Sequence, residues 1–218
     1  MAALENSPHK DNTIIVYTAD HGLAMGSHGL LGKQNVYEQS MRCPLIIHGP
    51  GIPQGESSEA FTYVHDLYAT LCGFAGVERP DGIDSLDLAP LMDGTMGRLH
   101  AYAFLPFQDN QRAINDGHWK LHVYPKINHT LLFDLKSDPH EINNLAGMIE
   151  HKAQLEEREK LIDRARILTG DRYPYAVAVP ESKENNFDNS KRVLDVWQPK
   201  WIRDKYFDGR EKSNHGRK

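Results

Sequence analysis

Cysteine is scarce in this sequence. Only Cys43 and Cys72 occur among 218 residues, which is too few for a disulfide framework or a cysteine-based zinc site. No apolar run is long enough to span a bilayer, and the opening stretch MAALENSPHKDN lacks the apolar core of a signal peptide. The net charge of −5 argues against nucleic-acid binding, which needs a basic face. What remains is a globular protein, with 39% apolar residues to build its core.

Residues 1–97 have the pattern of an α/β unit. Apolar segments predict three strands, at residues 13–18, 44–48 and 61–64. The first is β-branched and apolar, which is typical of a strand buried on both faces in a parallel sheet. Asp66 is a suitable cap for a helix over residues 67–75, which carries Leu67, Leu71 and Phe74 along one side. Alternating strands and helices predict a mostly parallel sheet.

Residues 98–170 predict a second part, a small antiparallel sheet covered by a long helix. The turn Asn115-Asp116-Gly117 lies inside the segment 111–124, and further strands are expected over residues 100–107 and 130–135. A helix should begin after Asn143 or Asn144 and run to Leu168. Residues 171–218 predict a polar, extended tail that wraps the body, with Trp197 and Trp201 as isolated anchors and a disordered end at REKSNHGRK.

The loop that follows the first predicted strand carries the residues of chemical interest. Asp20 and His21 come directly after the strand, where sites form in open α/β sheets, and they offer an oxygen and a nitrogen donor to a divalent cation. Lys33 ends the same loop and would repel that cation unless an anion lay between them. His28 could donate to the same anion. The loop therefore predicts a site for a sulfate or phosphate ester, held between a metal ion and an ammonium group.

Each of these residues also has a simpler interpretation. An Asp-His pair in a glycine-rich loop is more often a capped turn than a metal site. His28 alone is more often a hydrogen-bonding loop residue, and Lys33 alone is more often a solvated surface lysine. Two ligands also cannot complete a site, because Ca²⁺ takes six to eight oxygen ligands and Mg²⁺ requires octahedral coordination. Further ligands must therefore come from elsewhere.

A longer pattern changes the balance between these interpretations. It consists of Asp20-His21-Gly22, Gly26-x-His28-Gly29, Lys33, Tyr37-Glu38, Arg42-x-Pro44-Leu45-Ile46 and Gly49-Pro50-Gly51. Its order and spacing resemble the C-terminal half of the type I sulfatases, in the alkaline phosphatase superfamily. The segments INDGHWKLHVY and LLFDLKSDPHEINNLA resemble the C-terminal antiparallel sheet of that family and its Asp-Pro-x-Glu-x-x-Asn-Leu motif. The resemblance covers residues 11–170 and implies a partial alkaline-phosphatase-like fold.

The resemblance assigns roles to the loop residues. Asp20 and His21 would be metal ligands, with calcium the usual ion, and Lys33 would be the catalytic residue that binds the sulfate. His28 stays a candidate substrate-binding residue, without a role given by the family.

Other residues of the same pattern are expected to be structural. Glu38 and Arg42 would form an ion pair beside Tyr37 that braces the loop. Asp138 and Glu141 would fix the turn before the long helix.

The nucleophile of the family is absent from this sequence. It lies in a Cys/Ser-x-Pro-x-Arg motif, whose Cys or Ser becomes formylglycine, and neither Cys43 nor Cys72 has the right neighbours. The early strand with paired aspartates is also missing. The resemblance therefore predicts a fragment or a truncated product that is inactive alone. It should be unstable or homo-oligomeric unless a complementary N-terminal half covers its apolar sheet edge.

The sequence is compatible with several interpretations of the function. The substrate implied by the family is a sulfated small molecule or glycan, and the compartment is periplasmic, extracellular or lysosomal. A phosphonate or phosphate ester hydrolase shares the fold and much of the loop. A non-catalytic module that binds a cation or a partner is a rival from another class.

Overall fold

The computed structural model describes residues 2–184, 199–201 and 204. The chain divides into two units, residues 1–181 and 182–218, and all described sheets and the helices α2 to α5 belong to the first. The predicted anchor Trp197 and the predicted disordered end at 210–218 lie outside the described residues, and Trp201 is exposed. The predicted divisions at residues 97 and 170 stay a prediction. No helix among the described residues is long and apolar enough to cross a membrane.

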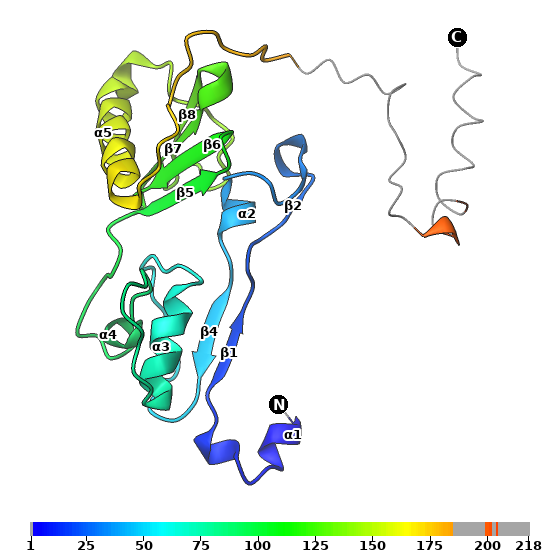
Figure 1. Cartoon of the computed structure of the whole chain (residues 1–218), viewed down its shortest axis with the longest axis vertical. Helices are drawn as coiled ribbons and strands as arrows, with labels where there is room; N and C mark the ends of the chain where they lie inside the picture. Colours follow the sequence, from blue (N-terminus) through cyan, green and yellow to red (C-terminus); the bar gives the residue numbers. More distant parts are fainter. Residues whose placement is uncertain (1, 185–198, 202–203, 205–218) are drawn as a thin grey trace. The chain divides into compact units, whose positions relative to one another are not determined.

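The first two predicted strands are present, but their pairing differs from the prediction. β1 (Ile15–Thr18) and β4 (Leu45–His48) form a two-stranded antiparallel ribbon in which Tyr17 lies opposite Ile46 (Figure 1). Every strand pair among the described residues is antiparallel, so the parallel pairing expected for residues 13–18 is not observed. Burial on both faces was also wrong, because Tyr17 is 62% exposed and Ile46 60%.

The predicted helix is α3 (Asp66–Ala75), which begins one residue earlier than expected. Asp66 is its first residue and not its N-cap, and the buried Asp66 carboxylate accepts the backbone N–H groups of Tyr63 (2.7 Å) and Leu86 (2.9 Å). Because residues 61–66 form this turn, the strand expected at 61–64 is wrong, and only an isolated bridge from Phe61 to His100 remains. A short helix, α4 (Ala89–Met92), follows.

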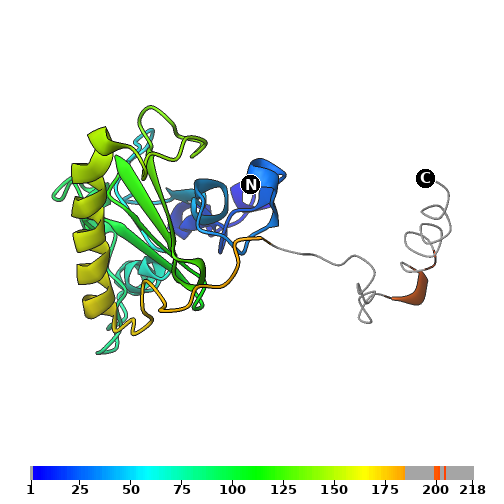
Figure 2. The same cartoon turned by 90° about the horizontal axis from the view of Figure 1, so that it is seen from above.

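The second predicted part is confirmed in its main features. Four antiparallel strands form one sheet in the order β5-β6-β7-β8, with bounds Ala103–Phe107, Gln111–Asn115, Trp119–Tyr124 and His129–Asp134. Helix α5 (Lys152–Thr169) covers one face of this sheet (Figure 2). The helix begins later than predicted, because Asn144 does not cap it. The Asn144 side chain instead accepts the N–H groups of Leu132 and Ala146.

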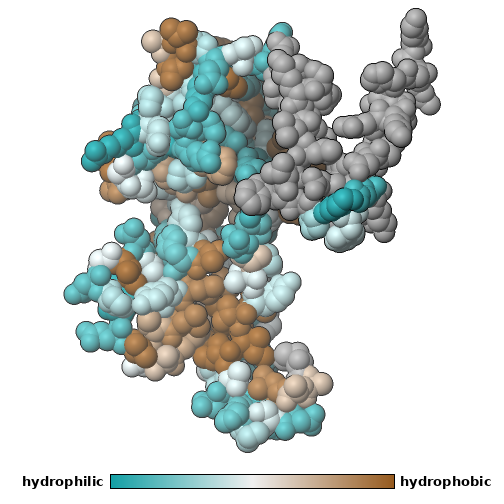
Figure 3. Space-filling model, turned by 45° about the vertical axis from the view of Figure 1, so that its right-hand side comes forward, coloured by the Kyte–Doolittle hydropathy of each residue, from teal (hydrophilic) through white to brown (hydrophobic). Residues whose placement is uncertain are grey.

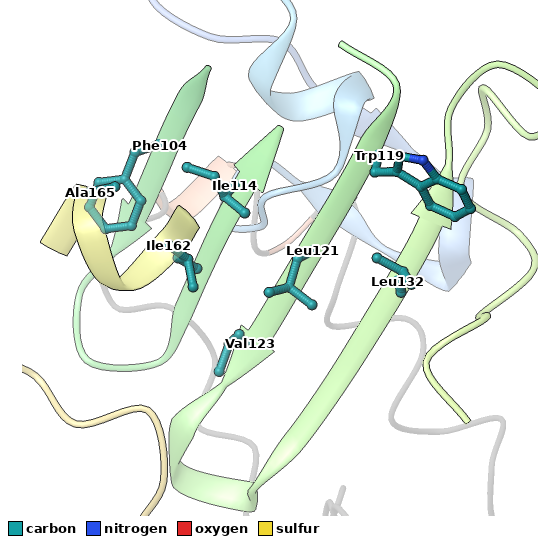
Figure 4. Packing of buried hydrophobic residues seen from close by; sticks show 8 residues of the cluster. All are labelled: Phe104, Ile114, Trp119, Leu121, Val123, Leu132, Ile162 and Ala165. Atoms are coloured by element: carbon teal, nitrogen blue, oxygen red, sulfur yellow. The ribbon is translucent and has the colours of Figure 1, made fainter. Parts of the chain in front are cut away.

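The hydrophobic core lies between this sheet and α5. Side chains from all four strands point toward the helix (Figure 4), and the buried cluster consists of Phe104, Ile114, Trp119, Leu121, Val123, Leu132, Ile162 and Ala165. Fully burying each large aliphatic or aromatic side chain contributes about 1.5–3 kcal/mol. The segment after α5 is fastened to the same sheet, because Arg112 forms a bidentate ion pair with Asp171. This part of the chain is therefore a rigid support for the loops beside it.

Candidate metal and anion site

The candidate site is the loop that leaves β1. Asp20 and His21 follow the strand, and a short hairpin of β2 (Ala24–Met25) and β3 (Leu31–Gly32) then returns the chain to Lys33. The Lys33 Nζ atom lies 2.5 Å from His21 Nε2. An Asp20 carboxylate oxygen lies 3.3 Å from the same ring nitrogen. Asp20, His21 and Lys33, which lie up to thirteen positions apart, therefore converge on one point.

The tautomer of His21 follows from its backbone contact. Nδ1 lies 2.7 Å from the carbonyl oxygen of Gly22, which can only accept a hydrogen bond. Nδ1 therefore carries the proton, and the lone pair of Nε2 faces the Lys33 ammonium. Metal-binding histidines likewise donate through one ring nitrogen and present the lone pair of the other, although here Lys33 Nζ occupies the position that faces this lone pair. This geometry fits a role for His21 as a ligand.

Gly22 holds the loop against the short helix α2 (Glu38–Met41). Its N–H donates to the carbonyl oxygen of Ser40 at 2.8 Å. A Cβ atom at this position would lie 2.1 Å from the carbonyl oxygen of Gln39, so the backbones approach too closely for any side chain. The glycine of the Asp-His-Gly motif is thus required by packing, and α2 sets the position of the two residues before it.

The described residues do not by themselves form a complete metal site. The Asp20 side chain is 81% exposed and that of His21 is 31% exposed, so both can reach a ligand from outside. No group of three or more His, Cys, Asp or Glu side chains that could hold a metal ion occurs in the described part of the chain. Asp20 and His21 fit two positions of a coordination shell whose other donors must come from outside these residues.

His28 lies away from the meeting point of His21 and Lys33. Its ring stacks on Tyr37, with centroids 3.9 Å apart and planes inclined by 12°. The backbone of His28 has a φ of 55°, which is rare for a residue with a side chain. The structure therefore brings Asp20, His21 and Lys33 together and places His28 on an aromatic neighbour.

The ion pair predicted between Glu38 and Arg42 was wrong. The Glu38 carboxylate accepts hydrogen bonds from Lys120 Nζ at 2.8 Å and from Asn115 Nδ2 at 3.1 Å. Helix α2 ends at Met41 and Arg42 has extended dihedrals, so the two side chains do not share one helical face. Arg42 is exposed. Glu38 thus connects α2 to the antiparallel sheet rather than bracing the loop locally.

Of the two acidic residues expected to fix the turn after β8, only Asp138 does so. Its carboxylate accepts the N–H groups of Ile142 and Asn143 at 2.8 and 2.7 Å. Glu141 points inward and contacts Lys120 Nζ at 2.9 Å and His122 Nε2 at 3.0 Å. The prediction for Glu141 was wrong, because its carboxylate accepts a charge-assisted hydrogen bond from the buried Lys120 instead of binding the turn.

The side chains of Lys120, His122 and Glu141 are fully buried. Burial lowers the pKa of His122 to about 4, although the neighbouring Glu141 opposes this shift. Burial also acts to raise the pKa of Glu141, but the hydrogen bond from His122 and the charge of Lys120 outweigh it and bring that pKa to about 2. The cluster therefore holds a charged Lys–Glu pair and a neutral imidazole near pH 7.

Sequence analysis missed this cluster, although strand β7 carries a signal for it. Lys120 and His122 alternate with Trp119, Leu121 and Val123, so the apolar side chains share the face toward α5 and the polar ones share the other face. A lysine and a histidine two residues apart on one face of a central strand indicate either a solvated face or a buried polar network. Their complete burial shows the second case.

Comparison with known proteins places this chain in a family. The family model for the C-terminal region of N-sulphoglucosamine sulphohydrolase matches residues 26–167. The chain is 33% identical over 204 residues to an N-acetylglucosamine-6-O-sulfatase from Bacteroides thetaiotaomicron. This alignment covers 88% of this chain and 34% of that protein. The alignment to Arylsulfatase K from Xenopus laevis is 31% identical and covers 71% of this chain and 32% of the relative.

Solved structures give the same result for the fold. A protein solved in complex with its substrate D-glucosamine-2-N,6-O-disulfate superposes with a TM-score of 0.71 at 31% identity, over 79% of this chain and 38% of that one. A phosphonate monoester hydrolase from Silicibacter pomeroyi superposes with a TM-score of 0.70 at 28% identity, over 79% of this chain and 38% of that one.

The fold and the loop thus match the C-terminal region of proteins of the alkaline phosphatase superfamily. The chain belongs to the sulfatase family, and it spans about a third of the length of the curated relatives named above.

Proposed function

We propose that this chain supplies two calcium ligands and a sulfate-binding lysine to the active site of a sulfuric ester hydrolase. The observation that carries the proposal is the convergence of Asp20, His21 and Lys33, with Lys33 Nζ 2.5 Å from His21 Nε2. Calcium bound there would polarise the ester oxygens and offset their charge. Asp20 would supply an oxygen ligand, and His21 would supply its Nε2 lone pair once the Lys33 ammonium group moves away from it.

Lys33 takes the catalytic role in this proposal. Its ammonium group would bind the anionic oxygens of the ester and stabilise the charge that develops on the leaving oxygen. The negative group would separate Lys33 from the cation, so that the repulsion between them is offset. His28 is a candidate for a second contact to the substrate, since it lies on the hairpin that connects His21 to Lys33.

The proposed substrate is a sulfated small molecule or glycan. The N-acetylglucosamine-6-O-sulfatase relative and the neighbour solved with a disulfated glucosamine support a sulfated amino sugar within that class. A phosphonate or phosphate ester is the second candidate, which the structural likeness to a phosphonate monoester hydrolase favours. The sequence contains no Cys/Ser-x-Pro-x-Arg motif, so the formylglycine nucleophile would have to come from another segment.

We further propose that a complementary α/β segment covers the ribbon of β1 and β4. Tyr17 and Ile46 lie opposite each other on its open face and are 62% and 60% exposed. On α3, Tyr68 and Leu71 are 50% and 46% exposed. Figure 3 shows hydrophobic surface over this part of the molecule. Contiguous exposed apolar surface usually marks an interaction site, and self-association is the alternative outcome.

Reconstitution with an N-terminal sulfatase segment tests the proposal. Both segments are purified together. Turnover of an aryl sulfate, an aryl phosphate and an aryl phosphonate with the same aryl group is measured for the wild type and for Lys33→Ala. Sulfatase turnover that falls about a hundred- to a thousandfold in Lys33→Ala is expected, on the scale of losing one anion-stabilising donor. Preferential turnover of the phosphonate would support the second candidate.

Calcium titration of the chain supplies the matched control. Binding that Asp20→Ala abolishes and Asp81→Ala leaves unchanged would support the metal site, since Asp81 is exposed and lies in a different loop. Equal calcium binding by all three forms would overturn the assignment of Asp20. Calcium binding without any turnover after reconstitution would instead favour a non-catalytic module.

A further inference from the structure

Glu141 is a fully buried carboxylate that the proposed chemistry does not use. Its backbone has a φ of 56°, a conformation that a residue with a side chain adopts only when its surroundings hold it there. Three donors surround its carboxylate: Lys120 Nζ at 2.9 Å, His122 Nε2 at 3.0 Å and the backbone N–H of Glu38 at 2.7 Å. The last of these contacts joins residues 103 positions apart in the sequence.

The contact with Glu38 reaches the first residue of α2. Lys120 reinforces it, because the same ammonium group also binds the Glu38 side chain at 2.8 Å. Two residues further along α2, the carbonyl oxygen of Ser40 accepts the N–H of Gly22. The C-terminal sheet therefore holds the helix against which the Asp-His-Gly turn is docked.

A second connection runs through Tyr37, the residue before α2. Its ring stacks on His28 at 3.9 Å and meets the His122 ring edge-on, with centroids 4.8 Å apart. His28 lies in the middle of the loop that ends at Lys33. The loop is thus held at two points, by Gly22 near its beginning and by His28 near its centre, and both supports lead to the same buried cluster.

We propose that Glu141 is a positioning residue for the loop of residues 20–33, and that it acts with Lys120 through α2. A buried ion pair seldom stabilises a fold more than apolar side chains would, but it fixes the mutual orientation of the elements that carry it. Here it fixes α2 relative to the sheet, and so fixes where His21 and Lys33 meet. The inference rests on the proposed function only in treating this loop as the active-site loop.

Amide hydrogen exchange of the full 218-residue chain, followed by NMR, tests this role. In Glu141→Gln the exchange of the Gly22 amide should become about tenfold faster, because one charge-assisted support of α2 is lost. The amides of Ile114 and Leu121, which pair on the two inner strands of the sheet, should change less than about twofold. Asp138→Asn is the matched control, since it alters a carboxylate of the same turn that contacts only the turn itself, and it should leave Gly22 unchanged.

Two results would overturn the inference. The first is unchanged exchange at Gly22 in Glu141→Gln. The second is acceleration of the Ile114 and Leu121 amides equal to that of Gly22, which would make Glu141 a residue of general stability. If Glu141→Gln does not fold, the double variant Lys120→Met/Glu141→Gln takes its place, because it removes both buried charges rather than one. Exchange at Gly22 requires no metal ion or ester, so it is independent of whether the chain contributes to sulfate hydrolysis.

Discussion

Lowering the pH from 7 to 5 should destabilise this protein through one residue, His122. Its imidazole is fully buried, and Nε2 donates to the Glu141 carboxylate at 3.0 Å. Nδ1 has no hydrogen-bond partner among the described residues. A proton on Nδ1 would therefore be a buried donor without an acceptor, in a ring close to the Lys120 ammonium. Burial accordingly lowers the pKa of His122 from 6.5 to about 4.

The sign and size of the effect follow from linkage. Between pH 6.5 and 4 the unfolded chain binds a proton at this residue and the folded chain does not, so stability falls as the pH falls. Each unit of difference in pKa corresponds to about 1.4 kcal/mol, so the free energy of unfolding should fall by about 3 kcal/mol over the whole pH range. About 2 kcal/mol of this loss should occur between pH 7 and pH 5. Glu141 contributes little to this change. Its pKa is lowered from 4.5 to about 2, so the stability that its ionised carboxylate provides is lost mainly below pH 4.5.

Urea unfolding at pH 7 and pH 5, compared between the wild type and His122→Gln, measures this difference. Glutamine keeps an N–H donor for Glu141 and does not titrate. The wild type should lose about 2 kcal/mol more than His122→Gln over this interval, with similar urea dependence in both. Equal losses in the two proteins would refute the reasoning, as would an NMR titration of His122 with a midpoint near 6.5.

Two further substitutions test one close backbone contact and one buried ion pair. Gly22→Ala should abolish calcium binding by the loop, because the new Cβ atom would lie 2.1 Å from a backbone oxygen of α2. Gly97→Ala is the control and should leave calcium binding unchanged, because no atom lies within 4 Å of the Cβ position there. Arg112→Met should cost about 3–5 kcal/mol in urea unfolding because it leaves Asp171 without its bidentate partner, and the exposed Arg164→Met should cost less than about 0.5 kcal/mol.

The antiparallel sheet could be predicted because its signals are local. The turn Asn115-Asp116-Gly117 indicates a hairpin, and in the structure Gly117 has a φ of 92° while the Asn115 side chain accepts its N–H. The pairing of residues 13–18 could not be predicted in the same way. An apolar, β-branched segment shows that a strand is buried or will be covered, but it carries no information about the direction of its neighbour. The neighbour of β1 is β4, some thirty positions later.

The same distinction applies to the site. Asp20, His21 and Lys33 lie in one short loop, so their spacing alone predicts that they could meet, and their contacts agree with that prediction. The support of the loop was missed because Glu38, Lys120 and Glu141 come from three distant segments. Nothing in a single sequence shows that a carboxylate after one strand will reach a helix 103 positions earlier. Only the fold brings them together.

Two incomplete features of β1 lead to a last prediction. The strand leaves Tyr17 exposed on its open face, and the loop after it carries Asp20 and His21, which would be only two of the ligands of the proposed calcium site. In α/β folds, sites form at the carboxyl ends of strands, so a segment that covers β1 can also add ligands beside Asp20.

Calcium and the complementary segment should therefore each strengthen the binding of the other, by the same factor. Titrating the segment with and without calcium measures this factor, which should be about 5–150-fold for a typical coupling. In Asp20→Ala the segment should still bind, through the apolar face, but calcium should no longer tighten it. If calcium tightens binding equally in Asp20→Ala and the wild type, the coupling does not pass through this loop.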